Sequence, residues 1–400
     1  MVDERLRGRW GILALLFASI AINLLDRQVL SLMAGPIREE FKLSNSDYAN
    51  IVFAFTLGLT LAQLPAGIWL DRIGVRYGLP VIMAVWSVAN ALHATARSLA
   101  QFMGFRFLLG IGECGNYSAG VKVISQRFPQ NERALAGGLF NAGTVIGAAL
   151  APWVLVAIYK AWGWRMAFVL PSVLGLAWIV PWLLFYRDSA GTRTQRQSVD
   201  FWPLLRFRQV WGVMLMRALA GPVVHFYWYW LPEYLKRERG FSMEMIAQYA
   251  GIPFVFAGLG NIFGGVFANA LMRRGWSADR TRKAAFLLGT LLSAASVLVP
   301  FAPGQVSAVA LICVATFGLA STVANHIGLL TDLFEPKVLA GVTGLTGLTE
   351  GVFNMAIQLS TGRVVDHFSY LPVFVAAGVM PMLALGSLFG LVRRVEPVRP

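Results

Sequence analysis

The chain has 400 residues, of which 57% are apolar and only 14% are charged, and its formal net charge is +14. A soluble domain carries about 25% charged residues, so this composition excludes an ordinary soluble protein and indicates a membrane protein. The basic charge alone would also fit a nucleic-acid-binding protein. Lys and Arg, however, gather at the two ends of the chain and in every second loop between apolar segments. That distribution is typical of membrane orientation, so the expected partner is membrane lipid and not nucleic acid.

Twelve apolar segments follow one another along the chain, each close to the length of about 20 residues that a helix needs to cross a bilayer. We therefore predict an all-α membrane protein with twelve transmembrane helices. The excess of Lys and Arg in alternate loops places both termini in the cytoplasm. The expected ranges are 10–33, 48–70, 77–96, 99–125, 134–159, 164–186, 208–235, 246–271, 283–301, 304–331, 340–364 and 370–392.

Four ionisable residues lie inside two of these segments: Asp26 and Arg27 in the first, and Arg106 and Glu113 in the fourth. A charge at the bilayer centre costs roughly 2.5–3.5 kcal/mol, so such groups normally face partners or a water-filled path. Arg27 is the candidate for binding a substrate carboxylate, because a planar guanidinium matches a carboxylate in two parallel hydrogen bonds. A purely structural ion pair is the alternative interpretation.

Asp26 and Glu113 are the candidate proton-coupling residues, since a buried carboxylate that loses its paired cation should take up a proton. Adjacent helical residues point about 100° apart, so Asp26 and Arg27 are not expected to face the same point. Arg106 lies nearly two turns before Glu113 on the same face and is expected to tether one of the two acids.

Three glycines in the fourth segment, Gly110, Gly112 and Gly115, match the spacing of a dinucleotide-binding fingerprint. The required context is a preceding strand, and this string lies inside an apolar helix. The spacing therefore favours close packing of helices through small residues.

The chain also repeats itself. The string Gly67-Ile-Trp-Leu-Asp71-Arg72-Ile-Gly74-Val-Arg76 ends the second segment, and Gly265 and Asn269 follow at an offset of 198 residues, with Arg273 nearby. Ser44 and Ser242 share this offset, and each is expected to cap a helix. We predict a duplicated six-helix unit, with bundles at 1–190 and 208–400 joined by a cytoplasmic linker at 191–207, and a binding site near the midplane between the halves.

Further candidates for substrate binding come from polar and aromatic residues inside the segments. Tyr227 and Trp230 belong to an aromatic cluster in the seventh segment, although such clusters are also typical of the membrane interface. Glu350 lies inside the eleventh segment, where the sequence identifies no partner for it. The remaining candidates for substrate binding are Asn141, Asn325, His326 and Asn354. For these residues a role in helix packing is the alternative interpretation.

Over essentially its whole length the sequence resembles the major facilitator superfamily, on the evidence of the string from Gly67 to Arg76. Within it, the chain resembles the anion:cation symporter branch. The strings that carry this second resemblance are Asn23-Leu-Leu-Asp26-Arg27, Arg106-Phe-Leu-Leu-Gly110-Ile-Gly112-Glu113, Phe128-Pro129-Gln-Asn-Glu132-Arg133, Trp230-Leu-Pro232-Glu-Tyr234-Leu, Arg274-Gly-Trp276 and Asp332-Leu-Phe334.

The resemblance implies a secondary active transporter of the bacterial inner membrane that works as a monomer by alternating access. It would be no enzyme, with no catalytic residues, metal or cofactor. The proton would be the coupling ion and a hexuronate-like or other sugar-acid carboxylate the substrate. The resemblance also implies gating through contacts that break and re-form. The residues implied in gating are Asp71, Arg72, Arg76, Asn269 and Arg273.

Some sugar-acid carriers of this branch have a Tyr near the position of Leu59 and a Gln near that of Thr144, and both are missing here. A smaller or aromatic carboxylate is therefore an alternative substrate. An antiporter or exchanger is the alternative mechanism.

Overall fold

The computed structural model describes residues 8–129, 132–187 and 203–398, and these residues form helices and connecting turns with no strand among them. The side chains of a few residues within the helices lie outside the description, namely Leu64, Asp71, Ala134, Pro336, Lys337 and Ala340. Contacts divide the chain into two compact units, Met1–Arg196 with Ile246–Gly251, and Gln197–Met245 with Ile252–Pro400. The boundaries predicted around 191–207 stay a prediction, because most of that segment is outside the described residues.

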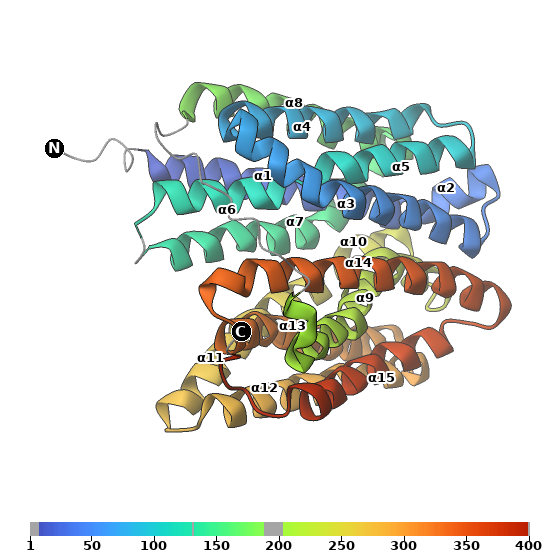
Figure 1. The fold of residues 1–400 in the computed structure, drawn as a ribbon. Helices are drawn as coiled ribbons and strands as arrows, with labels where there is room; N and C mark the ends of the chain where they lie inside the picture. Colours follow the sequence, from blue (N-terminus) through green and yellow to red (C-terminus); the bar gives the residue numbers. More distant parts are fainter. Residues whose placement is uncertain (1–7, 130–131, 188–202, 399–400) are drawn as a thin grey trace. The chain divides into compact units, whose positions relative to one another are not determined.

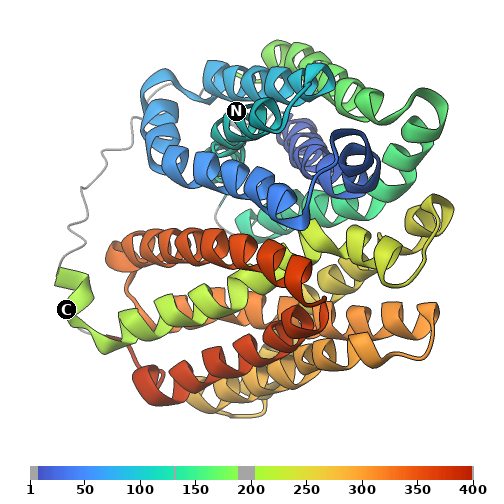
Figure 2. The ribbon, with the colours of Figure 1, turned by 90° about the vertical axis from the view of Figure 1, so that its right-hand side faces the viewer.

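Figure 1 shows the helices of each unit lying roughly along a common direction, and Figure 2 shows the same helices after a quarter turn. The first unit contains α1 (Arg9–Leu32), α2 (Ala34–Phe41), α3 (Asn45–Ile73), α4 (Val75–Leu92), α5 (Leu99–Glu113), α6 (Asn116–Arg127), α7 (Arg133–Trp162) and α8 (Trp164–Phe185). The rest of the chain contains α9 (Arg208–Arg237), α10 (Met243–Tyr249), α11 (Ile252–Arg273), α12 (Ala278–Ser293), the 3-10 helix η4 (Ala294–Phe301), α13 (Gln305–Leu333), α14 (Pro336–His367), α15 (Leu371–Ser387) and η5 (Leu388–Val392).

Helix packing follows the same scheme in the two units. In the first unit α1 packs on α7, α3 on α5, and α4 on α8. In the second unit α9 packs on α14, α11 on α13, and α12 with η4 on α15. Helices at the same position in the order of each half therefore pack on equivalent partners. This confirms the predicted pair of pseudo-symmetric six-helix bundles.

The capping serines predicted from the repeat are present in both units. Ser44 precedes α3, and its hydroxyl accepts a hydrogen bond from the backbone N–H of Asp47 at 3.0 Å, while the Asp47 side chain accepts from the Ser44 backbone N–H. Ser242 precedes α10, and its hydroxyl accepts from the backbone N–H of Met245 at 3.3 Å. Each serine satisfies a donor that the first helical turn leaves without an intrahelical partner.

The twelve predicted segments all fall on helices, with two differences in detail. The fourth segment is broken, because α5 ends at Glu113 and α6 begins at Asn116. The eighth begins as the short helix α10 and continues as α11. The eight-residue helix α2 was not predicted, because it is shorter than a span and lies between two of them.

Within the described part of the chain, nine helices are long and apolar enough to cross a membrane. The other three predicted spans correspond to α3, to α5 followed by α6, and to α14. Large apolar side chains point outward over much of the molecule; Phe185, Phe301 and Val306 are each about two-thirds exposed. An apolar exterior of this extent is unsuited to water and suited to lipid.

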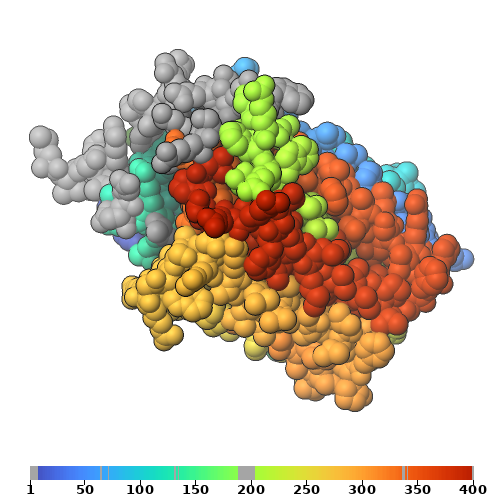
Figure 3. All heavy atoms as spheres, turned by 60° about the horizontal axis from the view of Figure 1, so that its bottom comes forward, coloured from blue at the N-terminus to red at the C-terminus, as the bar shows by residue number. Residues whose placement is uncertain are grey.

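The C-terminal segment, from η5 to Val398, packs against other helices of the second unit. A Cβ added at Gly212 of α9 would lie 2.8 Å from the Val392 side chain, so the two backbones approach closely. Figure 3 shows the start of α9 in green beside the red C-terminal segment. Val398 continues this contact by donating its backbone N–H to the Leu333 carbonyl at 2.8 Å.

Candidate functional site

The four charged residues predicted from the first and fourth segments meet in the interior of the first unit. The Arg27 Nε of α1 donates to the Glu113 Oε2 of α5 at 2.5 Å. The Glu113 side chain is fully buried, whereas 16% of the Arg27 side chain remains exposed. The guanidinium also lies over the Phe55 ring of α3, 5.4 Å from its centroid. A fully buried carboxylate is thus paired with an Arg side chain that stays partly exposed.

Asp26 faces a different helix from Arg27, as their adjacent positions on α1 predict. It is fully buried, and its two oxygens accept hydrogen bonds from α4, from the Trp86 Nε1 at 3.1 Å and the Asn90 Nδ2 at 2.8 Å. The same Asn90 amide lies 3.2 Å from the Phe168 carbonyl and from the Ser172 hydroxyl of α8. The position of Asp26 is therefore fixed by neutral donors on α4.

Arg106 lies between aromatic rings of the first unit. Its guanidinium carbon is 5.9 Å from the Phe55 ring centroid and 6.0 Å from that of Phe168. Arg106 is 1% exposed and lies close enough for its charge to act on both Asp26 and Glu113. Two acids and two bases therefore occupy one buried cluster, and this formal neutrality lowers the cost of holding charges away from water.

Close helix packing brings these residues together. A Cβ added to Gly110 would lie 2.2 Å from the Phe55 carbonyl oxygen, and one added to Gly112 would lie 2.7 Å from the Trp86 backbone nitrogen. Only glycine lets α5 approach both α3 and α4 so closely. The glycines that match the dinucleotide spacing therefore act as packing residues that bring Phe55 and Trp86 up to the charged cluster.

Four of the predicted substrate-binding residues make hydrogen bonds within the second unit. The Tyr227 hydroxyl lies 2.7 Å from that of Ser296, and the Trp230 Nε1 donates to the Gln358 Oε1 at 2.8 Å. The Gln358 amide in turn donates to the Asn354 Oδ1 at 3.1 Å. The Asn325 amide donates to the backbone of α11 and α13, to the carbonyls of Gly264 and Ser321. These bonds hold the second bundle together, and a substrate role for the four residues stays a prediction.

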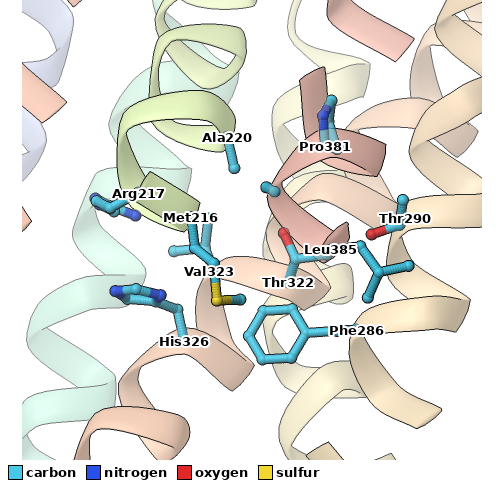
Figure 4. A pocket seen from close by; sticks show the side chains of 11 residues that line it. Met216, Arg217, Ala220, Phe286, Thr290, Thr322, Val323, His326, Pro381 and Leu385 are labelled. Atoms are coloured by element: carbon cyan, nitrogen blue, oxygen red, sulfur yellow. The ribbon is translucent and has the colours of Figure 1, made fainter. Parts of the chain in front are cut away.

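His326 is placed differently, because it lines a cavity inside the second unit (Figure 4). Side chains from α9, α12, α13 and α15 surround this small cavity, which has a volume of about 20 Å³. Arg217 lines it on the same side as His326. His326 is 7% exposed, and its Nε2 has no hydrogen-bond partner among the described residues.

The other predicted site residues lie toward the surface. Asn141 is exposed on α7 and donates to the Gly137 carbonyl of its own helix at 3.0 Å. Arg72 is exposed near the end of α3, and Arg76 lies in the first turn of α4 after Gly74, whose φ of 87° suits glycine. Asn269 and Arg273 are exposed at the end of α11. The Asp71 side chain lies outside the description, so the gating residues remain predicted.

The partners of two buried acids, Asp26 and Glu350, were not predicted from the sequence. Trp86 and Asn90 were not identified as partners of Asp26, although a polar Asn inside the apolar third segment was a usable signal. The partner of Glu350 was also missing, and it is Arg217, whose Nε lies 2.6 Å from the Glu350 Oε2. Within the described part of the chain, no group of three His, Cys, Asp or Glu side chains is placed to hold a metal ion.

Comparison with known proteins places this geometry in context. A family model described as Major Facilitator Superfamily matches residues 16–349. The hexuronate transporter of Escherichia coli K12 is 29% identical, over 95% of this chain and 93% of that protein. A probable L-galactonate transporter of the same organism is 31% identical, over 94% of this chain and 87% of that protein. The crystal structure of a bacterial homologue of the human lysosomal transporter Spinster superposes with a TM-score of 0.81 and 18% identity, over 98% of both chains.

Proposed function

Because the chain belongs to the Major Facilitator Superfamily, whose members are transporters and not enzymes, we propose that it carries an organic anion together with a proton. The proposed substrate is a hexuronate-like or other sugar-acid carboxylate. The observation that carries the proposal is the Arg27–Glu113 pair, in which a partly exposed Arg side chain is bonded to a fully buried carboxylate.

Binding would proceed by exchange of carboxylates at Arg27. A substrate carboxylate that reaches the Arg27 guanidinium can form charge-assisted hydrogen bonds and displace Glu113. Glu113 is then a buried charge without its cation, which is costly unless the carboxylate takes up a proton. One anion and one proton therefore enter the site together, and leave it together when Glu113 pairs again with Arg27.

Asp26 and Arg106 complete the proposed coupling set. Asp26 receives hydrogen bonds from neutral donors on α4, and Arg106 balances the charge of either acid. A proton on one carboxylate changes the charge that the other one faces, so the two acids titrate as a coupled pair. Alternating access of the two bundles, with the loop residues around Arg72 and Arg76 as the gate, would carry this site from one side of the membrane to the other.

The substrate class rests on the relatives, two of which are named for hexuronate and L-galactonate. A smaller or aromatic carboxylate is the alternative, because a single guanidinium recognises any carboxylate. The proposed location is a bacterial inner membrane, with both termini in the cytoplasm.

The test is uptake by the purified protein in proteoliposomes. Radiolabelled galacturonate, gluconate, benzoate and succinate are offered with the outside acid, with no gradient, and with the outside alkaline. Symport predicts that the outside-acid gradient drives accumulation of the sugar acids and that this accumulation collapses with a protonophore. Accumulation driven by the opposite gradient would identify an antiporter. Uptake of benzoate or succinate in place of the sugar acids would correct the substrate class.

A further inference from the structure

One aromatic ring lies beside both arginines of the charged cluster in the first unit. The Phe55 ring of α3 has its centroid 5.4 Å from the Arg27 guanidinium carbon and 5.9 Å from that of Arg106. Both distances lie within the range of about 6 Å in which a cation is attracted to the face of an aromatic ring. Phe55 is 2% exposed, so little water weakens this attraction. The ring therefore holds two cations that come from different helices, α1 and α5.

The close packing of α3 on α5 keeps Phe55 in place. A Cβ added to Gly110 of α5 would lie 2.2 Å from the Phe55 carbonyl oxygen. A Cβ added to Gly58 of α3 would lie 2.2 Å from the Phe107 carbonyl oxygen. Each helix thus has a glycine where the backbone of the other one approaches. The backbone at position 55 has little room to move, so the ring offers a fixed surface to the two arginines.

The Phe55 ring and Glu113 hold Arg27 in different ways. Glu113 accepts a hydrogen bond of 2.5 Å from the Arg27 Nε, so a carboxylate that binds Arg27 competes with Glu113 for the same cation. The ring attracts the guanidinium through the negative charge density of its face and carries no oxygen that competes for the N–H groups. A substrate carboxylate can therefore bind these N–H groups while the ring contact stays. The ring is a neutral partner that Arg27 keeps when it exchanges carboxylates.

We propose that Phe55 is a positioning residue, which holds the Arg27 guanidinium in place for the substrate carboxylate once Glu113 has released it. The inference rests on the proposed function for the exchange of carboxylates at Arg27. Without substrate, the bond to Glu113 already orients the guanidinium, and this bond is lost when substrate binds. The ring therefore contributes more to the substrate-bound state. Weakening the attraction between ring and cation should lower the affinity for substrate.

Ring fluorination tests this proposal, because each fluorine withdraws electron density from the face of the ring and changes the shape of the side chain little. Phenylalanine analogues with one, two and three ring fluorines are placed at position 55 of the full-length protein. Isothermal titration calorimetry in detergent then measures the affinity for galacturonate. The dissociation constant should rise with each fluorine, by about two- to thirtyfold over the series. The matched control places the same analogues at Phe334, which is 4% exposed in a cluster of apolar residues of the second unit, and should leave the affinity unchanged.

A second variant, Phe55→Leu, keeps an apolar side chain and removes the ring, so its affinity should fall at least as far as that of the analogue with three fluorines. Thermal unfolding checks that each protein is folded. A flat series at position 55, or a series equal to the one at Phe334, would overturn the positioning role. If the wild type binds galacturonate and the series is flat, only this role fails. If the wild type binds none of galacturonate, gluconate, benzoate and succinate, the proposed function fails, and the role of Phe55 fails with it.

Discussion

Asp26 and Arg27 are neighbours on α1, yet they bind to different helices: Asp26 accepts from Trp86 and Asn90 of α4, and Arg27 donates to Glu113 of α5. The rotation of about 100° between adjacent helical positions separates a carboxylate held by neutral donors from a cation held by an acid. This division lets Arg27 exchange its partner while Asp26 remains fixed. It is the geometric basis of the proposed coupling.

The shape of the Arg27 side chain should matter as much as its charge. Arg27→Lys keeps the charge and loses the planar fork, so binding of the sugar acid should weaken roughly 10- to 150-fold, the value of a hydrogen bond to a charged group of about 1.5–3 kcal/mol. Titration calorimetry measures the change. Arg165→Lys is the control, because Arg165 forms an exposed ion pair with Glu40 at 2.6 Å in the same unit. An unchanged affinity in Arg27→Lys would mean that this guanidinium does not bind the substrate.

Asn90 should contribute to stability as well as to the site. Asn90→Ala removes the amide that bonds Asp26, Phe168 and Ser172, and a buried acceptor left without its donor costs about 1–3 kcal/mol. A clear fall in the melting temperature is expected. Asn141→Ala should stay within about 0.5 kcal/mol of the wild type, because Asn141 is exposed and bonds only its own helix. Equal effects of the two changes would show that the bonds to α8 and Asp26 add nothing.

Replacing each of two glycines of α5 by alanine should affect the stability of the protein differently. A Cβ at position 110 would lie 2.2 Å from the Phe55 carbonyl, whereas one at position 104 has nothing within 4 Å. Gly110→Ala should therefore destabilise the protein and impair transport. Gly104→Ala should be neutral or stabilising by up to about 1 kcal/mol, the helix-propensity difference. Thermal unfolding and uptake measure the two effects, and a stable, active Gly110→Ala protein would contradict the close packing of α5 on α3.

A pH-dependent contribution to stability should come from Glu40 of α2. Hydrogen bonds from Arg165 hold the pKa of Glu40 below its ordinary value, against an opposing effect of burial, and the Trp164 Nε1–H and the Arg165 charge add to the lowering. A lowered folded-state pKa stabilises the protein above the unfolded value of about 4.3, and this stabilisation fades as the pH falls through the folded-state pKa. Glu40→Gln should lower the melting temperature at pH 7 and lower it less near pH 3. The same difference at both pH values would rule out the charge of Glu40 as its cause.

Much of the fold could be predicted from the sequence, because the length of an apolar segment is set by bilayer thickness and the repeat appears as a constant offset. The separation of Asp26 from Arg27 also follows from helix geometry alone. The partners were harder to predict. Arg217 and Glu350 are 133 positions apart, and only the packing of α9 on α14 brings them together. Trp86 and Asn90 carry no charge, and of the two only Asn90, a polar residue inside an apolar segment, offered a signal in the sequence.

The substrate candidates of the second half show the limit of residue type as evidence. Tyr227, Trp230 and Asn354 have the hydrogen-bonding groups that a sugar acid needs, but in the structure these groups bond to Ser296 and Gln358 of the same unit. A polar side chain inside an apolar span serves packing and binding equally well. Only the position of its partner distinguishes the two roles.

The central claim is that substrate takes Arg27 from Glu113 and that Glu113 then takes a proton. Glu113→Gln tests it most directly, in proteoliposomes that report both counterflow exchange of labelled galacturonate and proton-driven accumulation. The mechanism predicts that exchange continues while the outside-acid gradient no longer drives accumulation, because the amide cannot carry the proton. Proton-driven accumulation of galacturonate that persists in Glu113→Gln would contradict it.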